Sequence, residues 1–170
     1  MGDYKNKLIE ITEYLKANSL LVSTAESCTA GQMISLLASV PGAGQLLESG
    51  YVVYSPEAKE RILHVSPQTI ERYGLTSEEV ALEMAHGALK GGPATVAIAT
   101  TGVAGPDSID GIEPGTVCLA WLFAINGRCL GFTRTREFTG DRLEVQIAAS
   151  FYALEQVQRF HGKALSGEEK

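Results

Sequence analysis

The chain has 170 residues, a length typical of one domain, and it carries a formal net charge of −6 at neutral pH. With 45% hydrophobic and 20% charged residues, it has enough apolar side chains for a buried core, which excludes a wholly disordered chain. The acidic balance excludes a protein that holds nucleic acid through a general excess of positive charge.

The sequence also carries indications of where the protein works. Its first residues lack the hydrophobic block of a signal peptide, and no apolar run reaches the roughly 20 residues that span a bilayer. The three cysteines, Cys28, Cys118 and Cys129, form an odd set without framework spacing, as is usual in a reducing compartment. We therefore expect a cytoplasmic protein that binds neither membranes nor nucleic acid.

Helices alternate with apolar strands along the chain. The first helix is predicted over 4–17, where Tyr4, Leu8, Ile11 and Leu15 share one stripe at 3.6-residue spacing. The next helices are predicted over 31–40, 55–63, 66–74, 76–92 and 141–160. Strands are predicted over 20–25, 46–55, 94–102, 116–125 and 128–137, with Asn126-Gly127 as the hairpin turn between the last two.

This alternation predicts an α/β fold, a three-layer α/β/α sandwich with a mixed, mostly parallel sheet and a C-terminal β-hairpin. We expect a single domain over 1–162 and a polar tail over 163–170. In such folds ligands gather at the carboxyl ends of the strands. The stretches "STAESCTAG" and "TTGVAGPD" both lie at such ends.

"STAESCTAG" places three potential nucleophiles, Ser27, Cys28 and Thr29, between a strand and a helix. Free N–H groups at the start of that helix would hold a phosphate or stabilise an oxyanion, whereas the alternative is that a hydroxyl only caps the helix. A cysteine nucleophile normally needs a base such as histidine, and no motif ties any of the three histidines to this turn. We therefore predict that Cys28 is a buried packing residue.

A serine nucleophile also needs a base, and Lys59 is the candidate. Tyr54 and Lys59 follow the second strand in "YSPEAK", so they approach the first turn if the two strands are neighbours. A desolvated lysine is neutral often enough to accept a serine proton, and a tyrosine hydroxyl can orient or relay that proton. A solvated surface lysine is the alternative.

The second glycine loop has features of an anion site. Spaced glycines allow close backbone approach, and successive N–H groups can form a nest, but the Gly-Lys-Ser/Thr ending of a P-loop is missing. Asp107, Asp110 and Glu113 miss the spacing of a Ca²⁺ loop, and no paired Cys/His spacing indicates zinc, so we expect a polar loop without a metal.

Three arginines follow this loop. Arg142 opens the last helix behind the capping residue Asp141, from where it would reach a phosphate. Arg134 and Arg136 alternate along one face of the last strand. For all three, an ordinary surface arginine is the alternative.

Together the motifs "AESCTAG", "GYVVYSPEAK", "TGVAGPD", "PGTV" and "GDR" occur in the order of one family. Over about residues 4–160 the sequence resembles the C-terminal domain of competence/damage-inducible protein CinA, found alone as nicotinamide-nucleotide amidase. The resemblance implies hydrolysis of nicotinamide mononucleotide to nicotinic acid mononucleotide and ammonia, in pyridine-nucleotide recycling, without a metal or organic cofactor. It places the nucleophile at Ser27, the base and later proton donor at Lys59, and a group that supports the transfer at Tyr54.

The resemblance also implies a substrate-binding set and a homodimer. Backbone N–H groups around Cys28 and Thr29, or in the 101–105 loop, would hold the oxyanion, and Arg142 would bind the phosphate. The implied set is Cys28, Thr29, Thr101, Gly102, Ala104, Gly105 and Arg142. The chain has Pro56 where the family commonly has asparagine, and Gln146 where an arginine is frequent.

Two other functions stay open from the sequence. The first is a catalytically silent module that keeps the nucleotide-binding fold, and it would tolerate the loss of Lys59. The second is a phosphotransferase, which would require a Mg²⁺ ligand set that the sequence does not offer.

Overall fold

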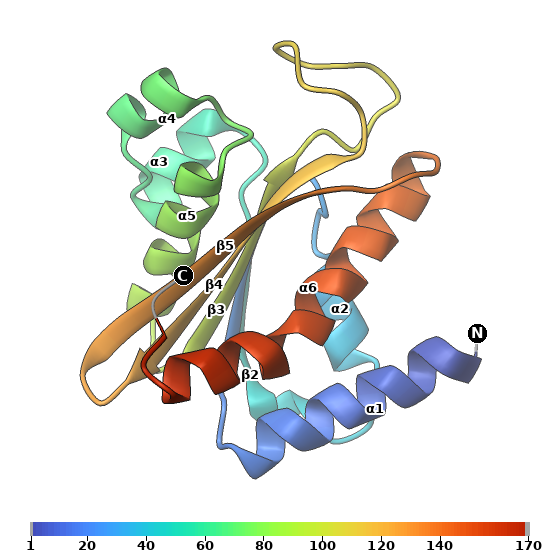
Figure 1. The fold of residues 1–170 in the computed structure, drawn as a ribbon, viewed down its shortest axis with the longest axis vertical. Coiled ribbons are helices and arrows are strands. Elements are labelled where there is room, and N and C mark those ends of the chain that lie inside the picture. Colours follow the sequence, from blue (N-terminus) through green and yellow to red (C-terminus); the bar gives the residue numbers. More distant parts are fainter. Residues whose placement is uncertain (1, 169–170) are drawn as a thin grey trace.

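A computed structural model of the protein describes residues 2–168. Its five strands form one mixed sheet in the order β2-β1-β3-β4-β5, and helices cover both faces (Figure 1). The strands are β1 (Val22–Glu26), β2 (Leu47–Val52), β3 (Val96–Gly102), β4 (Thr116–Ile125) and β5 (Arg128–Glu137). The helices are α1 (Gly2–Ala17), α2 (Gln32–Ala38), α3 (Pro56–Leu63), α4 (Pro67–Tyr73), α5 (Glu78–Lys90) and α6 (Arg142–Leu165), with a short 3₁₀ turn at Ala43–Leu46.

The predicted three-layer sandwich is confirmed. Helices α1, α2 and α6 pack on one face of the sheet, and α3, α4 and α5 pack on the other (Figure 1). β1 pairs in parallel with both β2 and β3, whereas the pairs β3–β4 and β4–β5 are antiparallel. The sheet is mixed as predicted but not mostly parallel, because β4 runs antiparallel to β3 as well as to its hairpin partner β5.

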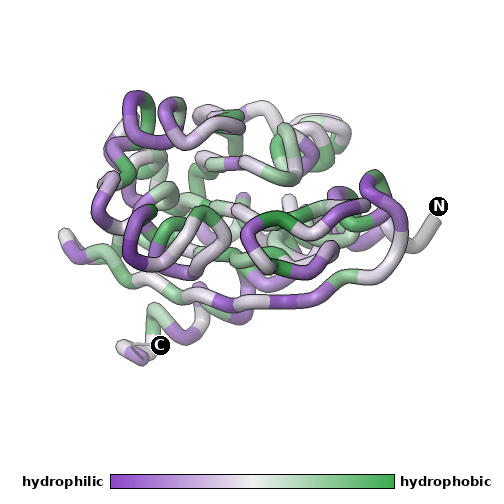
Figure 2. Tube along the Cα trace, turned by 90° about the horizontal axis from the view of Figure 1, so that it is seen from above, coloured by the Kyte–Doolittle hydropathy of each residue, from purple (hydrophilic) through white to green (hydrophobic). Residues whose placement is uncertain are grey.

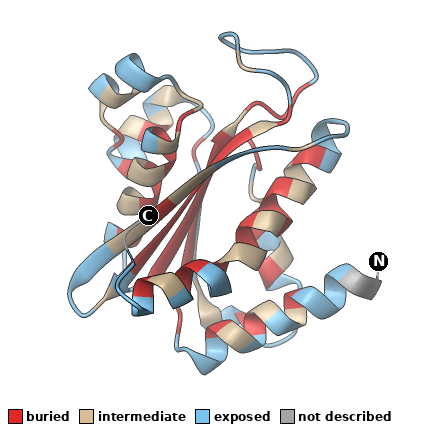
Figure 3. Ribbon diagram, viewed as in Figure 1, coloured by how far each residue is buried: buried red, intermediate tan, exposed pale blue. Residues whose placement is uncertain are grey.

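Both faces of the central strands are buried, as the continuous apolar run in β3 predicts (Figure 3). Large side chains face α6, where the Trp121 indole donates a hydrogen bond of 2.7 Å to the Ala153 carbonyl and stacks near Phe160. Small side chains, including Ala97 and Ala99, face α5. The sheet thus has a bulky aromatic side and a thin alanine-rich side.

Helices α3, α5 and α6 begin with side-chain caps, whereas Ser66 at the start of α4 makes no cap hydrogen bond. Along the chain trace, hydrophobic and hydrophilic residues alternate within the helical turns (Figure 2). Ser55 accepts a hydrogen bond from the Ala58 N–H at the start of α3, and Asp141 with Glu144 forms a capping box at the start of α6. Among residues 2–168, no helix is long and apolar enough to cross a membrane.

Some ends of helices and strands differ from the predicted ones. β2 ends at Val52, three residues before the predicted end, because the chain leaves the sheet there to begin α3. Tyr4 is 54% exposed, although it belongs to the predicted buried stripe, and its ring meets Phe151 edge to face. This contact packs Tyr4, near the N-terminal end of α1, against α6.

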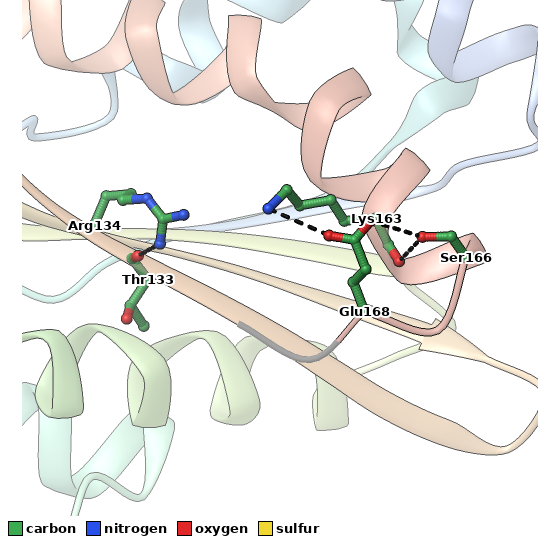
Figure 4. Close-up of polar contacts among 5 residues, drawn as sticks. All are labelled: Thr133, Arg134, Lys163, Ser166 and Glu168. Carbon is green, nitrogen blue, oxygen red and sulfur yellow. Dashed lines mark hydrogen bonds and ion pairs between the residues drawn. The ribbon is translucent and has the colours of Figure 1, made fainter.

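The last helix extends into the predicted tail. α6 continues through Leu165, and the following residues fold back on it, since the Ser166 hydroxyl donates to the Lys163 carbonyl and Lys163 pairs with Glu168 (Figure 4). Residue 1 of the predicted domain and residues 169–170 of the predicted tail lie outside the described residues.

The thin face of the sheet generates a stability prediction. A methyl group added at Gly87 in α5 would lie 2.1 Å from the Leu63 carbonyl oxygen of α3. We expect Gly87→Ala to lower the free energy of unfolding by roughly 1–3 kcal/mol despite alanine's better helix propensity. Chemical denaturation measures the change.

A matched control is available in α6. An added methyl group at Gly162 has no heavy atom within 4 Å, so Gly162→Ala should gain up to about 1 kcal/mol from helix propensity alone. Equal gains in both variants would show that α5 and α3 do not need this close approach.

Candidate active site

A serine and a lysine lie in hydrogen-bonding contact at the carboxyl ends of β1 and β2. Because β1 and β2 are parallel neighbours, the turn after β1 and the connection after β2 meet at the same edge. Lys59 of α3 places its Nζ 2.9 Å from the Ser27 Oγ. The strand adjacency on which the lysine assignment depended is confirmed.

The Lys59 ammonium is buried at the base of α3. The residue is only 2% exposed, and its Nζ also donates to the backbone carbonyls of Val53, at 2.9 Å, and Tyr54, at 3.3 Å. Burial lowers the pKa of Lys59 from its ordinary value of 10.5 to about 8. In the neutral amine, the two carbonyls hold the two remaining N–H groups, so the lone pair is directed at the Ser27 hydroxyl.

Cys28 lies beside this pair but is a poorer nucleophile. Burial raises the pKa of its thiol to about 12, so the thiolate is rare at neutral pH. None of the three histidines lines the cavity next to Cys28. His161 instead lies between α1 and α6, where its Nδ1 is 2.9 Å from the Tyr14 hydroxyl.

The turn that carries Ser27 is held by the buried carboxylate of Glu26. Glu26 is fully buried, and it accepts hydrogen bonds from the Thr29 hydroxyl and from three backbone N–H groups, those of Gly31, Met33 and Ile34. The expectation that the start of α2 offers these N–H groups to a substrate anion is wrong, because the carboxylate of the chain itself occupies them.

One N–H group next to the nucleophile stays available. Ser27 donates its own backbone N–H to the Thr100 carbonyl, at 3.0 Å, which joins the turn to β3. Among residues 2–168, no hydrogen bond joins the backbone N–H of Cys28 or Thr29 to another residue. Cys28 lines the cavity beside Ser27, so its N–H can stabilise negative charge that forms there, whereas Thr29 is fully buried.

A cavity of about 250 Å³ opens above the serine and the lysine. Its lining comes from the turn after β1, the β2–α3 connection, the α4–α5 connection, the loop after β3 and the start of α6. The lining residues are Ser27, Cys28, Tyr54, Lys59, Tyr73, Gly74, Leu75, Thr76, Thr101, Gly102, Val103, Ala104, Ile109, Asp110, Ile112 and Arg142.

Arg142 crosses one side of this cavity. Its guanidinium donates to the Gly105 carbonyl and to the Tyr54 hydroxyl, so it ties α6 to the loop after β3 and to the β2–α3 connection. Both acceptors are neutral, and among the described residues no carboxylate pairs with Arg142. The positive charge of Arg142 is thus held in place without being neutralised.

The structure brings most of the predicted substrate-binding set to the cavity. Cys28, Thr101, Gly102, Ala104 and Arg142 line it, whereas Thr29 and Gly105 do not. The Thr29 hydroxyl is directed inward to Glu26 and Thr100, and Gly105 contributes its carbonyl to Arg142. Thr101 lines the cavity while its hydroxyl donates to the Leu75 carbonyl, at 2.8 Å.

Several residues of the site were not predicted from the sequence. Tyr73 ends α4, and Leu75 and Thr76 lie in the α4–α5 connection, neither of which has a recognisable motif. The buried role of Glu26 was also missed. Glu26 belongs to "AESCTAG", but an acidic residue at the end of a strand is usually exposed to solvent. The sequence feature that could have indicated the role of Glu26 is an apolar strand that ends in glutamate just before a hydroxyl-rich turn.

Two differences from the family have structural explanations. Pro56 takes the first position of α3, where a helix needs no N–H, and Ser55 caps the helix in front of it. Gln146 donates from its side chain to the Cys28 carbonyl, at 2.8 Å, so it supports the nucleophile turn from α6.

The other candidate residues have packing roles. Arg134 and Arg136 lie over the rings of Phe160 and Tyr152, at 5.2 Å and 5.1 Å. Within residues 2–168, no group of three or more histidine, cysteine, aspartate or glutamate side chains is arranged to hold a metal ion.

The Glu26 network generates a prediction. Glu26→Ala removes the acceptor of four donors, two of them buried and two half-buried, so we expect the free energy of unfolding to fall by roughly 3 kcal/mol or more. Glu13→Ala, which removes an exposed carboxylate, should change it by less than about 0.5 kcal/mol. Denaturant titration of both variants measures the difference, and a similarly small effect at Glu26 would contradict the network.

Comparison with known proteins gives a consistent answer. The family model of the CinA C-terminal domain matches residues 5–161. The chain is 39% identical over 146 residues to the nicotinamide-nucleotide amidohydrolase PncC of Escherichia coli K12, covering 86% of this chain and 87% of that protein. It is 41% identical over 146 residues to a CinA-like protein of Chlorobium phaeobacteroides, covering 84% of this chain and 34% of that longer protein.

Solved structures agree with the sequence comparison. A CinA superfamily protein of Escherichia coli superposes with a TM-score of 0.84 at 38% identity, covering 92% of this chain and 90% of the other. The competence damage-inducible protein A of Klebsiella pneumoniae gives a TM-score of 0.86 at 32% identity, covering 94% and 97%. With sequence and fold in agreement over nearly the whole length, the chain belongs to the CinA C-terminal domain family.

Proposed function

We propose that the protein is an amidohydrolase that converts nicotinamide mononucleotide to nicotinic acid mononucleotide and ammonia. The observation that carries this proposal is the 2.9 Å contact between the Lys59 Nζ and the Ser27 Oγ in a buried site. Relatives named nicotinamide-nucleotide amidohydrolase, at 38–39% identity over most of the chain, support the substrate.

The first half of the reaction forms an ester on the serine. Neutral Lys59 accepts the Ser27 proton as the Ser27 Oγ attacks the carboxamide carbon, and the carbonyl oxygen becomes an oxyanion. The backbone N–H of Cys28, which lines the cavity beside Ser27, stabilises that oxyanion. Lys59 then returns the proton to the nitrogen, which leaves as ammonia.

The second half releases the acid. Lys59 accepts a proton from water as the water oxygen attacks the ester carbon, and the bond to the Ser27 Oγ breaks with return of the proton to that oxygen. One amide and one water are consumed, and one carboxylic acid and one ammonia are formed. The mechanism uses side chains of this chain for every proton transfer.

In the proposed complex, the substrate phosphate binds at the rim of the cavity. Arg142 carries the uncompensated charge there, and its planar guanidinium matches a phosphate group. The carboxamide then points to the buried Ser27 end. A mononucleotide thus spans the cavity from α6 to the base of α3.

The competing function is a catalytically silent module that binds the nucleotide without cleaving it. The lowered pKa of Lys59 favours the amidase, because a buried lysine in contact with a serine is costly for a protein that only binds. The cytoplasmic location and the homodimer stay predictions, and the three free cysteine thiols support the first.

Substitution of the nucleophile tests the reaction directly. In the presence of EDTA, we expect the native chain to release ammonia from nicotinamide mononucleotide, and Ser27→Ala and Lys59→Ala to lose at least about 10³-fold in kcat/KM. Cys28→Ala is the matched control and should keep most of the activity, because its thiol is protonated. Activity that survives in Ser27→Ala but disappears in Cys28→Ala would reverse the assignment. Nucleotide binding by the native chain without ammonia release would favour the silent module.

The lowered pKa of Lys59 predicts the pH dependence. The base must be neutral, so kcat/KM should rise with pH and level off above the pKa of about 8. At two pH units below it, activity should be roughly a hundredfold lower. Initial rates at constant ionic strength measure the profile. A flat profile from pH 6 to 9, or a rise centred near 10.5, would rule out Lys59 as the base.

A further inference from the structure

The Tyr54 hydroxyl has a different partner from the one that a proton relay needs. Lys59 contacts the backbone carbonyl of Tyr54, not its side chain. The hydroxyl accepts a hydrogen bond from the Arg142 guanidinium, and among the described residues it bonds neither Ser27 nor Lys59. Tyr54 is 55% exposed and lines the cavity, whereas Ser27 and Lys59 are buried.

Arg142 needs such a partner because it starts α6 with an exposed, flexible side chain. A free arginine has many rotamers, and ordering it on binding costs free energy. Two acceptors from separate segments, the Tyr54 hydroxyl and the Gly105 carbonyl, fix the guanidinium beforehand. The adjacent Asp141 is engaged as the cap of α6, so it does not neutralise Arg142.

We propose that the Tyr54 hydroxyl positions Arg142 for the substrate phosphate, and that it does not transfer the proton between Ser27 and Lys59. The guanidinium has five N–H donors, and its two contacts leave donors for two phosphate oxygens. Tyr54 therefore sets the preference for phosphorylated over unphosphorylated ligand. This inference rests on the proposed function for the nature of the substrate.

Binding measurements separate the two roles. In a Ser27→Ala background, which prevents turnover, calorimetry would give the Kd of nicotinamide mononucleotide and of nicotinamide riboside, the same molecule without phosphate. We expect Tyr54→Phe to weaken binding of the mononucleotide roughly tenfold and to leave binding of the riboside unchanged. Arg142→Ala should show the same selectivity with a larger loss, and adding Tyr54→Phe to it should cost nothing more.

Tyr4→Phe is the matched control. Tyr4 lies in α1, outside this cavity, and is similarly exposed, at 54%, and among the described residues its hydroxyl has no hydrogen-bond partner. The preference for phosphate should not change in this variant. Thermal unfolding of each variant verifies that the fold is intact.

Kinetics with Ser27 present give the second readout. A positioning role raises KM for the mononucleotide and leaves kcat within about twofold, whereas a proton relay lowers kcat by about 10²-fold or more for both ligands. Equal losses for both ligands, or a large fall in kcat, would overturn the proposal, as would a parent protein that binds both ligands equally well. If the native chain releases no ammonia while the phosphate-selective binding loss is still observed, the amidase function fails and the positioning role stands.

Discussion

The contact between Lys59 and Ser27 is the interaction on which the rest of the site depends. It exists because β1 and β2 are parallel neighbours, so that the turn after one strand and the helix after the other begin at the same edge of the sheet. Burying a lysine is unfavourable unless its N–H groups are bonded, and the backbone carbonyls of Val53 and Tyr54 provide those bonds. The same burial that makes the lysine costly lowers its pKa and makes it a base near neutral pH.

Charge is distributed unequally around the nucleophile. Glu26 uses its carboxylate to satisfy the N–H groups at the start of α2, so that end of the helix is no longer an anion site. The available donors are instead the backbone N–H of Cys28 beside Ser27 and the guanidinium of Arg142 at the rim. This division gives separate places to the two negative charges of the proposed reaction, the oxyanion near β1 and the phosphate near α6.

Local patterns in the sequence predicted most of the fold. The alternation of apolar strands with capped helices gave the sandwich, and Asn126-Gly127 gave the hairpin, because the physical causes lie within a few residues. Ends of elements were less predictable. The extension of α6 depends on distant parts of the chain, since His161 and Ala164 are buried and His161 contacts Tyr14 of α1.

The site was predicted only in part, because some of its contacts join residues that are distant in the sequence. Ser27 and Lys59 follow from motif order and strand adjacency, and the structure brings them together. The role of Glu26 was missed because only the folded turn shows that its carboxylate is buried. The partner of the Tyr54 hydroxyl lies in α6, far along the chain, and no local pattern encodes that contact.

The central claim is that Ser27 forms a covalent ester with the substrate, and mass spectrometry of acid-quenched reactions tests it most directly. Millisecond mixing of the native chain with nicotinamide mononucleotide, followed by digestion and fragmentation, would locate any adduct. We expect an added mass equal to the substrate minus ammonia on Ser27, which disappears as product forms. The same mass on Cys28, or ammonia release without an adduct at any quench time, would contradict it.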